Sequence, residues 1–245
     1  MREKEASLHR GPKLSQPRIV AVTGAYGILG AAVAKAAAGQ GAKVALIDFA
    51  TTAPEGLLEA CGPGALALSG VDLTDPDGAN AAIDEAAAKF GGLDVLINVA
   101  GGFAWQTHVD GDPAVWDRLY AMNVRTTANA SRAAIAHLKA SGAGRIVNIG
   151  ANGAVKAGAG MGAYAASKAG VHRLTESLAE ELKGQVTVNA VLPSIIDTPT
   201  NRADMPDADF ASWVTPDELA AVILFLASEA ASAVTGALIP VTGRV

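Results

Sequence analysis

Residues 18–30 read RIVAVTGAYGILG, and this stretch decides the fold predicted for the chain. Its first six residues form an apolar, β-branched run that is typical of a buried strand. Three glycines follow at once, Gly24, Gly27 and Gly30, and lead into an alanine-rich helix. A glycine-rich turn between a strand and a helix lets the backbone approach a pyrophosphate, whose charge the helix N-terminus favours. We therefore expect a dinucleotide site here.

Strand and helix patterns alternate along the rest of the chain. Apolar runs predict further strands at 43–48, 65–73, 93–98, 144–149, 186–192 and 237–241, and amphipathic or capped segments predict helices at 75–90, 112–140, 161–183 and 215–227. Residues 198–214 have no clean period and are expected to form a loop or a short-helix lid. The alternation predicts an α/β fold of the Rossmann type, a doubly wound, mainly parallel sheet in three α/β/α layers.

Length and composition favour one domain and exclude several classes of protein. Half of the 245 residues are hydrophobic, which suits a single dinucleotide-binding catalytic domain over residues 18–245, after a flexible N-terminal tail at 1–17. The formal net charge of −5 predicts no nucleic-acid partner, and the single Cys61 excludes a disulfide framework and a cysteine-based zinc site. No apolar run is long enough to span a membrane, and the charged N-terminus is not a secretory signal. We therefore expect a cytoplasmic protein with no metal and no membrane partner.

Asp48 predicts which dinucleotide binds. It stands 18 residues beyond Gly30, at the end of the second predicted strand, where a carboxylate accepts hydrogen bonds from the adenosine ribose hydroxyls. The same charge would repel a 2′-phosphate, and no Arg or Lys lies in the glycine turn to offset it. NAD(H) is therefore favoured, with NADP(H) as the alternative.

The segment 151–168, ANGAVKAGAGMGAYAASK, holds Tyr164 and Lys168 four residues apart. In a helix these two side chains lie on one face. A cation beside a phenol favours the ionised form, so the spacing predicts that the pKa of Tyr164 falls from about 10 to roughly 7 or 8. Such a phenol donates and accepts protons near neutral pH. On its own, the pair is more often a packed ring beside a solvated lysine.

Taken together, the motifs resemble those of the short-chain dehydrogenase/reductase family from Arg18 to Val245. The matching stretches, in chain order, are TGAYGILG, Asp48, Asp72 before Leu73, NVAG at Asn98–Gly101, MNV around Asn123, GRIVNI, Y-x-x-x-K, Pro193 after the sixth strand, and VTG near the C-terminus. The resemblance implies an NAD(P)-dependent oxidoreductase that acts on a small-molecule substrate as a homodimer or homotetramer.

The resemblance also implies a role for each residue of the site. Tyr164 would be the catalytic acid/base, Lys168 would bind the nicotinamide ribose and lower the pKa of the tyrosine, and Asn123 would help to hold a water of the proton relay. The residues implied to bind the cofactor are Thr23, Gly24, Tyr26, Gly27, Ile28, Leu29, Asp48, Asp72 and Leu73 (at the adenine), Asn98, Ala100, Gly101, Tyr164, Lys168, Pro193, and Ile196 and Thr198 (at the nicotinamide carboxamide).

One departure from the family pattern bears on the chemistry. The family's catalytic serine lies thirteen residues before the tyrosine, and that position is Ala151 here. The serine donates a hydrogen bond to the reacting oxygen, and losing such a donor costs on the order of 3 kcal/mol of transition-state stabilisation. Asn152 is adjacent and carries an amide donor. Alternatively, the substrate is a conjugated ring that does not concentrate charge on one oxygen.

The conjugated-ring alternative matches one branch of the family, the quinonoid dihydropteridine reductases. The glycine spacing G-x-x-G-x-x-G, the loop AGGFAW, the alanine at 151 and the segment LPSIIDTPTNRADMPDADFASW resemble that branch, whereas Asn123 and the C-terminal end follow the commoner pattern. Hydride transfer to such a ring, with Tyr164 as acid/base, is the first hypothesis. The alternatives are a carbonyl or alcohol oxidoreductase that lacks the serine, and an NAD-binding protein without turnover.

Aromatic side chains add further candidates for the substrate site. Phe103 and Trp105 follow the NVAG turn and are placed to stack on a flat substrate, and Trp213 in the lid is placed to close the pocket. With Ala151 and Asn152 they complete the predicted substrate residues. Three histidines show no metal-ligand spacing and are expected at the surface or in helix packing: His108, His137 and His172.

Overall fold

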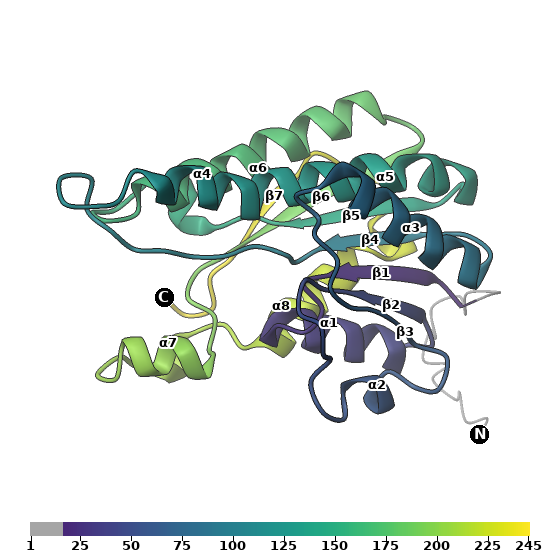
Figure 1. Ribbon diagram of the computed structural model, residues 1–245, viewed down its shortest axis with the longest axis horizontal. Coiled ribbons are helices and arrows are strands. Elements are labelled where there is room, and N and C mark those ends of the chain that lie inside the picture. Colours follow the sequence, from purple (N-terminus) through teal and green to yellow (C-terminus); the bar gives the residue numbers. More distant parts are fainter. Residues whose placement is uncertain (1–16) are drawn as a thin grey trace, which may run out of the picture.

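The computed structural model describes residues 17–245, so the tail expected at 1–17 lies, except for Pro17, outside the described residues. Seven parallel strands form one sheet in the order β3-β2-β1-β4-β5-β6-β7 (Figure 1). The predicted doubly wound parallel sheet is confirmed. The strands are β1 (Ile19–Thr23), β2 (Lys43–Ile47), β3 (Leu66–Leu68, shorter than the predicted 65–73), β4 (Val95–Asn98), β5 (Gly144–Ile149), β6 (Val186–Pro193) and β7 (Leu238–Val241).

Helices cover both faces of the sheet and give the predicted three layers (Figure 1). One face packs against α1 (Ile28–Gly39) and α8 (Pro216–Leu226), and the other against α3 (Pro76–Phe90), α5 (Thr126–Ser141) and α6 (Gly162–Glu181). The shorter helices are α2 (Leu57–Ala60), α4 (Ala114–Tyr120) and α7 (Pro199–Asp204). No helix within residues 17–245 is long and apolar enough to cross a membrane.

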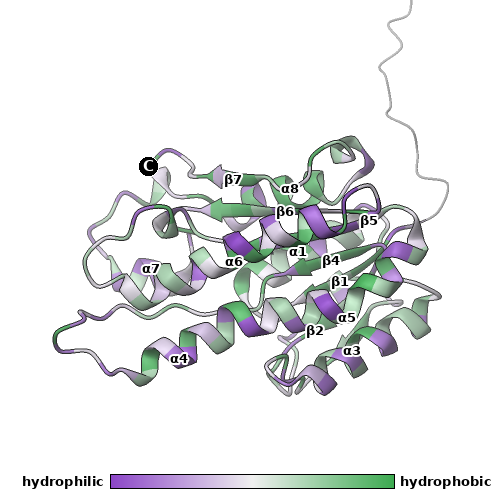
Figure 2. Ribbon diagram, turned by 90° about the horizontal axis from the view of Figure 1, so that it is seen from above, coloured by the Kyte–Doolittle hydropathy of each residue, from purple (hydrophilic) through white to green (hydrophobic). Residues whose placement is uncertain are grey.

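The strands are apolar on both sides because each side faces a helix layer. In β1, Val20 and Val22 pack into the core under α1 and α8, whereas Ala21 between them packs into the core under α3, α5 and α6. Figure 2 shows this as green strands inside and purple residues on the outward sides of α3, α5 and α6. Two cores on one sheet fix the register of every strand, and so fix which residues stand at its carboxyl edge.

Two helix starts predicted from the sequence are confirmed. The Asp75 carboxylate accepts hydrogen bonds from the backbone N–H groups of Asp77 and Gly78, and α3 follows it. Thr215 and Glu218 form a reciprocal capping box at the start of α8. In both helices a proline occupies the first position, where its missing N–H costs nothing.

The prediction of a single α-helix at 112–140 is wrong in one respect. It consists of α4, a π-helical turn at Ala121–Arg125 and α5. The residues at both junctions keep helical dihedral angles, so the rod is continuous, but one turn holds an extra residue. Asn123 lies in that turn, and its amide is bonded to the backbone of Gly102 and to Ser167. Such turns occur frequently at functional sites, and apolar periodicity does not report them.

Candidate active site

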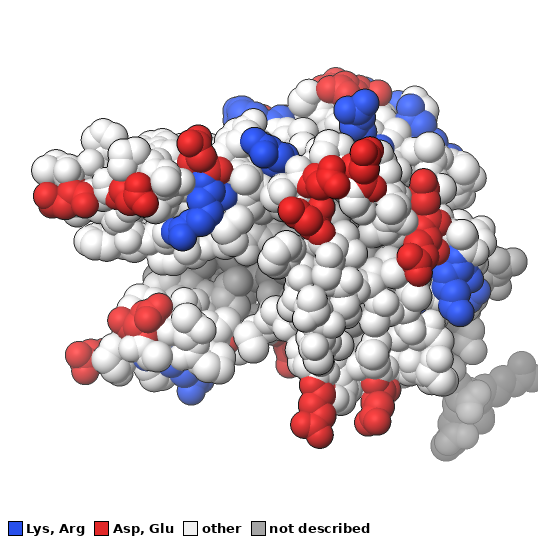
Figure 3. All heavy atoms as spheres, in the orientation of Figure 1, with Lys and Arg blue, Asp and Glu red and all other residues white. Residues whose placement is uncertain are grey.

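The predicted site residues gather at one edge of the sheet. Because the strands are parallel, the residues that follow β1, β2, β4, β5 and β6 all lie at their carboxyl ends. Figure 3 shows the molecule hollowed on this side, between the projection that carries α4 and the projection that carries α7, which Figure 1 locates. Ligands of doubly wound sheets bind outside this edge, near the point where the strand order reverses. Here that point lies between β1 and β4.

The glycine turn after β1 fits a pyrophosphate. Gly24 has φ +62°, and a Cβ built on it would lie 2.7 Å from the backbone nitrogen of Ala100, so only glycine fits. Gly30 packs against the carbonyl of Gly24 and has no room for a side chain. Gly27 differs, because a Cβ there would meet only the Gly24 carbonyl, at 3.5 Å, and it caps the exposed N-terminus of α1. No side chain caps the start of α1, so its first N–H groups remain available to an anion.

The Asp48 carboxylate is held in place by the backbone around it. Its two carboxylate oxygens accept hydrogen bonds from the backbone N–H groups of Tyr26 and Ala50, each at 2.9 Å. These bonds fix the carboxylate and leave lone pairs on both oxygens for hydroxyl donors. None of the ion pairs formed within residues 17–245 involves Asp48, so its charge has no cationic partner there. The arrangement fits the unphosphorylated ribose of NAD.

Some predicted cofactor residues can contribute only through their backbone. The Asn98 side chain is 2% exposed and donates to Ser131 Oγ and Asn148 Oδ1 beneath α5 and α6. Thr23 is also buried, and its Oγ1 accepts a hydrogen bond from the N–H of Ala100. These side chains brace the strand ends, and the sequence could not tell this role from contact with a ligand. Leu73 and Pro193 are likewise buried, whereas Tyr26, Ile28, Asp72, Gly101, Ile196 and Thr198 are partly or fully accessible.

Tyr164 and Lys168 lie on α6, one turn apart, next to the exit of β5. Lys168 Nζ donates to the carbonyl of Ile149 at 2.8 Å, and a Cβ on Gly101 would lie 3.4 Å from the same Nζ. The ring of Tyr164 meets Phe103 edge to face, with ring centroids 4.8 Å apart. Within residues 17–245 no group bonds the Tyr164 hydroxyl, and only its backbone carbonyl is engaged, by Ser167. The phenol is therefore free for an incoming oxygen.

The predicted lowering of the Tyr164 pKa is wrong for this structure. Burial raises the pKa of Tyr164 to about 12, and it also lowers the pKa of Lys168 to about 8. Burial disfavours the charged form of each group, and it is the cause of both shifts. At neutral pH the phenol is protonated and the ammonium is charged. The site as it stands favours Tyr164 as a proton donor.

The raised pKa of Tyr164 can be tested directly by titration. In the protein without cofactor, we expect the Tyr164 phenol to ionise only near pH 12, above the usual value of about 10, because burial penalises the phenolate. Absorbance at 295 nm, followed against pH for wild type minus Tyr164→Phe, isolates this one ring. A difference titration with its midpoint near pH 7 or 8 would instead support the tuning inferred from the sequence.

Asn123 and Ala151, two further predicted site residues, are both buried. The Asn123 amide is fully buried and satisfied, with Oδ1 accepting from Gly102 N–H and Nδ2 donating to the Gly102 carbonyl and to Ser167. It therefore fixes the loop after β4, and its side chain is not free to hold a water. Ala151 is 4% exposed and brings only a methyl group to the position of the expected serine. Asn152 beside it is exposed.

The aromatic candidates separate into two kinds. Phe103 and Trp105 are 58% and 60% exposed, so both rings are available to a substrate. Trp105 Nε1 donates to the carbonyl of Ala159, and Gln106 N–H donates to the carbonyl of Gly160, so the loops after β4 and β5 are joined. Trp213 is 3% exposed and packs on Phe210, so it anchors the lid and does not offer a ring to the cleft.

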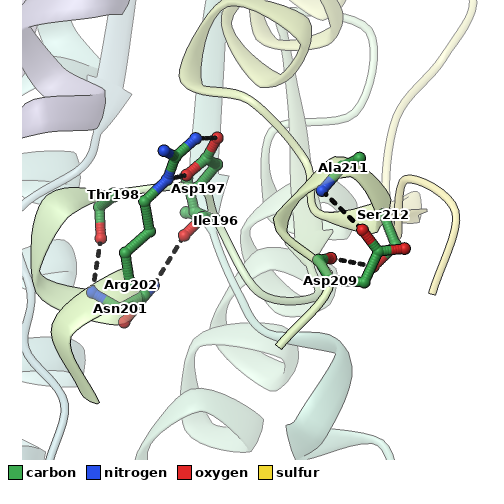
Figure 4. A network of polar contacts seen from close by, with 8 residues as sticks. All are labelled: Ile196, Asp197, Thr198, Asn201, Arg202, Asp209, Ala211 and Ser212. Atoms are coloured by element: carbon green, nitrogen blue, oxygen red, sulfur yellow. Dashed lines mark hydrogen bonds and ion pairs between the residues drawn. The ribbon is translucent and has the colours of Figure 1, made fainter. Parts of the chain in front are cut away.

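The lid predicted at 198–214 is a closed unit containing α7 and a 3₁₀ turn at Phe210–Ser212. Its two ends are joined where Asp197 N–H donates to Val214 O and Val214 N–H donates to Ile195 O. Figure 4 shows Asp197 and Arg202 facing each other in a two-bond ion pair, and Asn201 bonded to both Ile196 and Thr198. These contacts hold the lid beside the site as one piece.

No group of three or more His, Cys, Asp or Glu side chains within residues 17–245 is arranged to hold a metal ion. Sequence reasoning overlooked one residue of the site, His172, whose Nε2 accepts a hydrogen bond from the N–H of Ala151 at 3.3 Å. The sequence signal that could have identified His172 is its position, one turn of α6 beyond Lys168.

Comparison with known proteins gives one consistent family. A family model described as short chain dehydrogenase matches residues 18–209. The chain is 37% identical over 241 residues to cis-4-hydroxycyclohexanecarboxylate dehydrogenase of Sinomonas cyclohexanicum, covering 92% of this chain and 95% of the relative. It is 36% identical over 237 residues to galactitol 2-dehydrogenase (L-tagatose-forming) of Cereibacter sphaeroides, covering 91% and 92%.

Solved structures agree. A mutant short-chain dehydrogenase/reductase from Serratia marcescens superposes with a TM-score of 0.84 at 30% identity, covering 94% of this chain and 98% of that chain. Carveol dehydrogenase from Mycobacterium avium, solved in complex with NAD, gives a TM-score of 0.82 at 26% identity, covering 92% and 96%.

Proposed function

The chain belongs to the short chain dehydrogenase family, and on this premise we propose that it is an NAD(P)-dependent oxidoreductase that interconverts a secondary alcohol and its carbonyl compound through Tyr164. The observation that carries the proposal is a partly buried phenol whose hydroxyl has no partner among residues 17–245, beside the buried ammonium group of Lys168. The relatives at 37% and 36% identity are named for the oxidation of hydroxyl compounds, which supports this substrate class.

The residues present fit a nicotinamide dinucleotide. The open N-terminus of α1 at Gly27 would hold the pyrophosphate, and the Asp48 carboxylate would hold the adenosine ribose. Lys168 would hold the second ribose. When bound, this cofactor supplies or accepts the hydride. NAD(H) is favoured because the Asp48 carboxylate would repel a 2′-phosphate and forms no ion pair with a cation in the described part of the chain.

The protonated phenol supports reduction at neutral pH. Reduction of a carbonyl adds a hydride to the carbon and a proton to the oxygen, and Tyr164 Oη supplies that proton. The charged Lys168 would then stabilise the phenolate that remains against part of the penalty of burial. Much of the rate would come from holding the carbonyl against Oη within the cleft, since positioning alone contributes several kcal/mol.

A conjugated ring is the second candidate substrate, such as a quinonoid dihydropterin. One observation in its favour is Ala151, which has a methyl group where the family's serine would donate a hydrogen bond to the reacting oxygen. The other is the exposed ring of Phe103 beside Tyr164. A ring that spreads the incoming charge has less need of the second donor. The same phenol would deliver the proton to a ring nitrogen.

A substrate panel separates these candidates. Purified protein is assayed with NADH and with NADPH against cyclic and acyclic ketones and against quinonoid dihydropterin, with the chemical background subtracted. Ketone reduction supports the first candidate, and pterin reduction alone supports the second. NADH binding without turnover on either class would instead point to an NAD-binding protein without catalysis.

Ala151→Ser gives an independent answer. If the substrate is a carbonyl compound, we expect kcat/KM for the ketone to rise about tenfold to a hundredfold, because the new hydroxyl stands at the position of the missing donor. NADH affinity should stay within about twofold, since residue 151 is not placed at the cofactor. Ala151→Val is the matched control, because it adds bulk without a donor. A pterin reductase would gain nothing from the serine.

We also propose that the chain self-associates. Three large side chains on and just after α4 are exposed, Trp116, Tyr120 and Met122, at 39%, 53% and 37%. Exposed aromatic side chains on one helix are typical of an interface. Light scattering on the full chain tests this.

A further inference from the structure

Helix α6 turns three polar side chains toward the exit of β5. Tyr164, Lys168 and His172 follow one another at intervals of four residues, so they lie on one face of the helix. Tyr164 and Lys168 have roles in the proposed reaction. His172 is 3% exposed and has none so far. A buried imidazole is costly unless its polar atoms are satisfied, so its contacts indicate why it is there.

The imidazole holds the backbone on which the tyrosine site is built. His172 Nε2 accepts a hydrogen bond from Ala151 N–H at 3.3 Å. The ring also lies against Gly150, where a built Cβ would be 2.5 Å from Nε2, so no larger residue fits beneath it. The imidazole therefore lies directly against the backbone of Gly150, closer than a ring lies when it packs on another side chain.

Three consecutive residues are fixed by these contacts. The carbonyl of Ile149 accepts from Lys168 Nζ, Gly150 N–H donates to Val191 O, and Ala151 N–H donates to His172. Successive turns of α6 therefore clamp the two ends of the segment, while β6 holds its middle. This segment includes the Ile149 carbonyl, which anchors Lys168, and the methyl group of Ala151. Any shift of the segment therefore moves both groups.

The hydrogen bond defines the state of the ring. Nε2 accepts only when it is unprotonated, so His172 must be neutral with its proton on Nδ1. Burial first, and then the charges of Arg173 and Lys168, lower the pKa of His172 below its usual value, which keeps it neutral at pH 7. An apolar side chain would fill the same space but would leave Ala151 N–H without its partner.

We propose that His172 is a positioning residue of the active site, which holds the Gly150–Ala151 backbone so that Ile149 O anchors Lys168 beside Tyr164. The inference rests on the proposed oxidoreductase function for its effect on turnover, but the clamp itself is a property of the unliganded chain.

The test compares two replacements of His172. His172→Gln places an acceptor oxygen three bonds beyond Cβ, the same reach as Nε2, whereas His172→Met fills the space without a strong acceptor. Thr175→Val is the matched control, because Thr175 is another buried polar residue of α6 whose side chain bonds Asn148 and Val171 and makes no bond to residues 149–151. Each variant is compared with wild type by amide hydrogen exchange at residue 151, by NADH binding, by thermal midpoint, and by kcat and KM for the best ketone or pterin of the panel.

The expected result is a split between the variants. His172→Met should increase exchange at the Ala151 amide and lower kcat by about tenfold, with the KM for NADH within twofold, while His172→Gln should restore most of both. Thr175→Val should change neither exchange at residue 151 nor kcat beyond twofold.

Equal losses in the Gln and Met variants, or a kcat loss in Thr175→Val as large as in His172→Met, would overturn the proposal. So would unchanged exchange at Ala151 in His172→Met. If wild type turns over no panel substrate, the proposed function fails, and the exchange arm still decides whether the clamp exists.

Discussion

Tyr164→Phe is expected to lower kcat by about 10²–10⁴-fold and to leave NADH affinity within about threefold of wild type. The substitution removes only the hydroxyl, so the edge-to-face contact with Phe103 and the packing of α6 persist. No described residue bonds that hydroxyl, so its loss leaves no protein group unsatisfied and should not destabilise the fold. Without it, nothing at this position supplies the proton. Steady-state kinetics with the best panel substrate, together with NADH fluorescence titration, measure both quantities.

Tyr120→Phe is the matched control for this experiment. Tyr120 is 53% exposed on α4 and lies outside the site, so its variant should keep wild-type kcat. A Tyr164→Phe variant as active as wild type would remove the phenol from the mechanism. A parallel loss of NADH binding would mean instead that the ring supports the cofactor and that its effect on kcat is indirect.

The fold was predictable because its signals are local and repeated. The apolar run of β1, the glycines after it and the Asp75 and Thr215 caps each follow from a few neighbouring residues. Alternation of strands and helices then leaves the parallel, doubly wound sheet as the simplest arrangement. The position of Asp48 at the end of β2 was predictable for the same reason.

Features that depend on packing were not predictable. The sequence gives Tyr164 and Lys168 their spacing, but not their burial, and burial sets the direction of both pKa values. The π-helical turn at Asn123 depends on contacts with Gly102 and Ser167, which are 21 and 44 residues away. No local pattern reports contacts at such distances.

Side-chain direction was the other limit. Asn98 stands where the cofactor was expected, yet strand alternation turns its amide beneath α5 and α6. His172 was expected at the surface or in helix packing, and it is buried against the backbone that carries Ala151. In both cases the position along the chain was correct, and the partner could be found only from the fold.

Asp48→Asn is expected to change the preference between NADH and NADPH by about a hundredfold. In the proposed cofactor position the carboxylate would face the adenosine ribose, and it has no cationic partner among residues 17–245. A 2′-phosphate placed there would meet a like charge, which typically costs several kcal/mol. Removing the charge should therefore strengthen NADPH binding. NADH binding should weaken by about tenfold, because hydrogen bonds to a charged acceptor are worth about 1.5–3 kcal/mol and a neutral amide accepts less strongly.

The size of the change also depends on the local backbone. Asp48 accepts from both Tyr26 N–H and Ala50 N–H, and an amide can satisfy only one of them, so part of the NADH loss comes from a loosened turn. That part weakens the binding of NADH and of NADPH equally, so it cancels in the ratio of the kcat/KM values for the two cofactors. This ratio is therefore the quantity to measure. Glu59→Gln removes one negative charge from an exposed residue of α2, as Asp48→Asn does from the site, and so controls for the net charge of the protein. If the ratio in Asp48→Asn stays at its wild-type value, the 2′-position of the ribose does not lie at this carboxylate, and the assignment of the adenosine end to β2 fails with it.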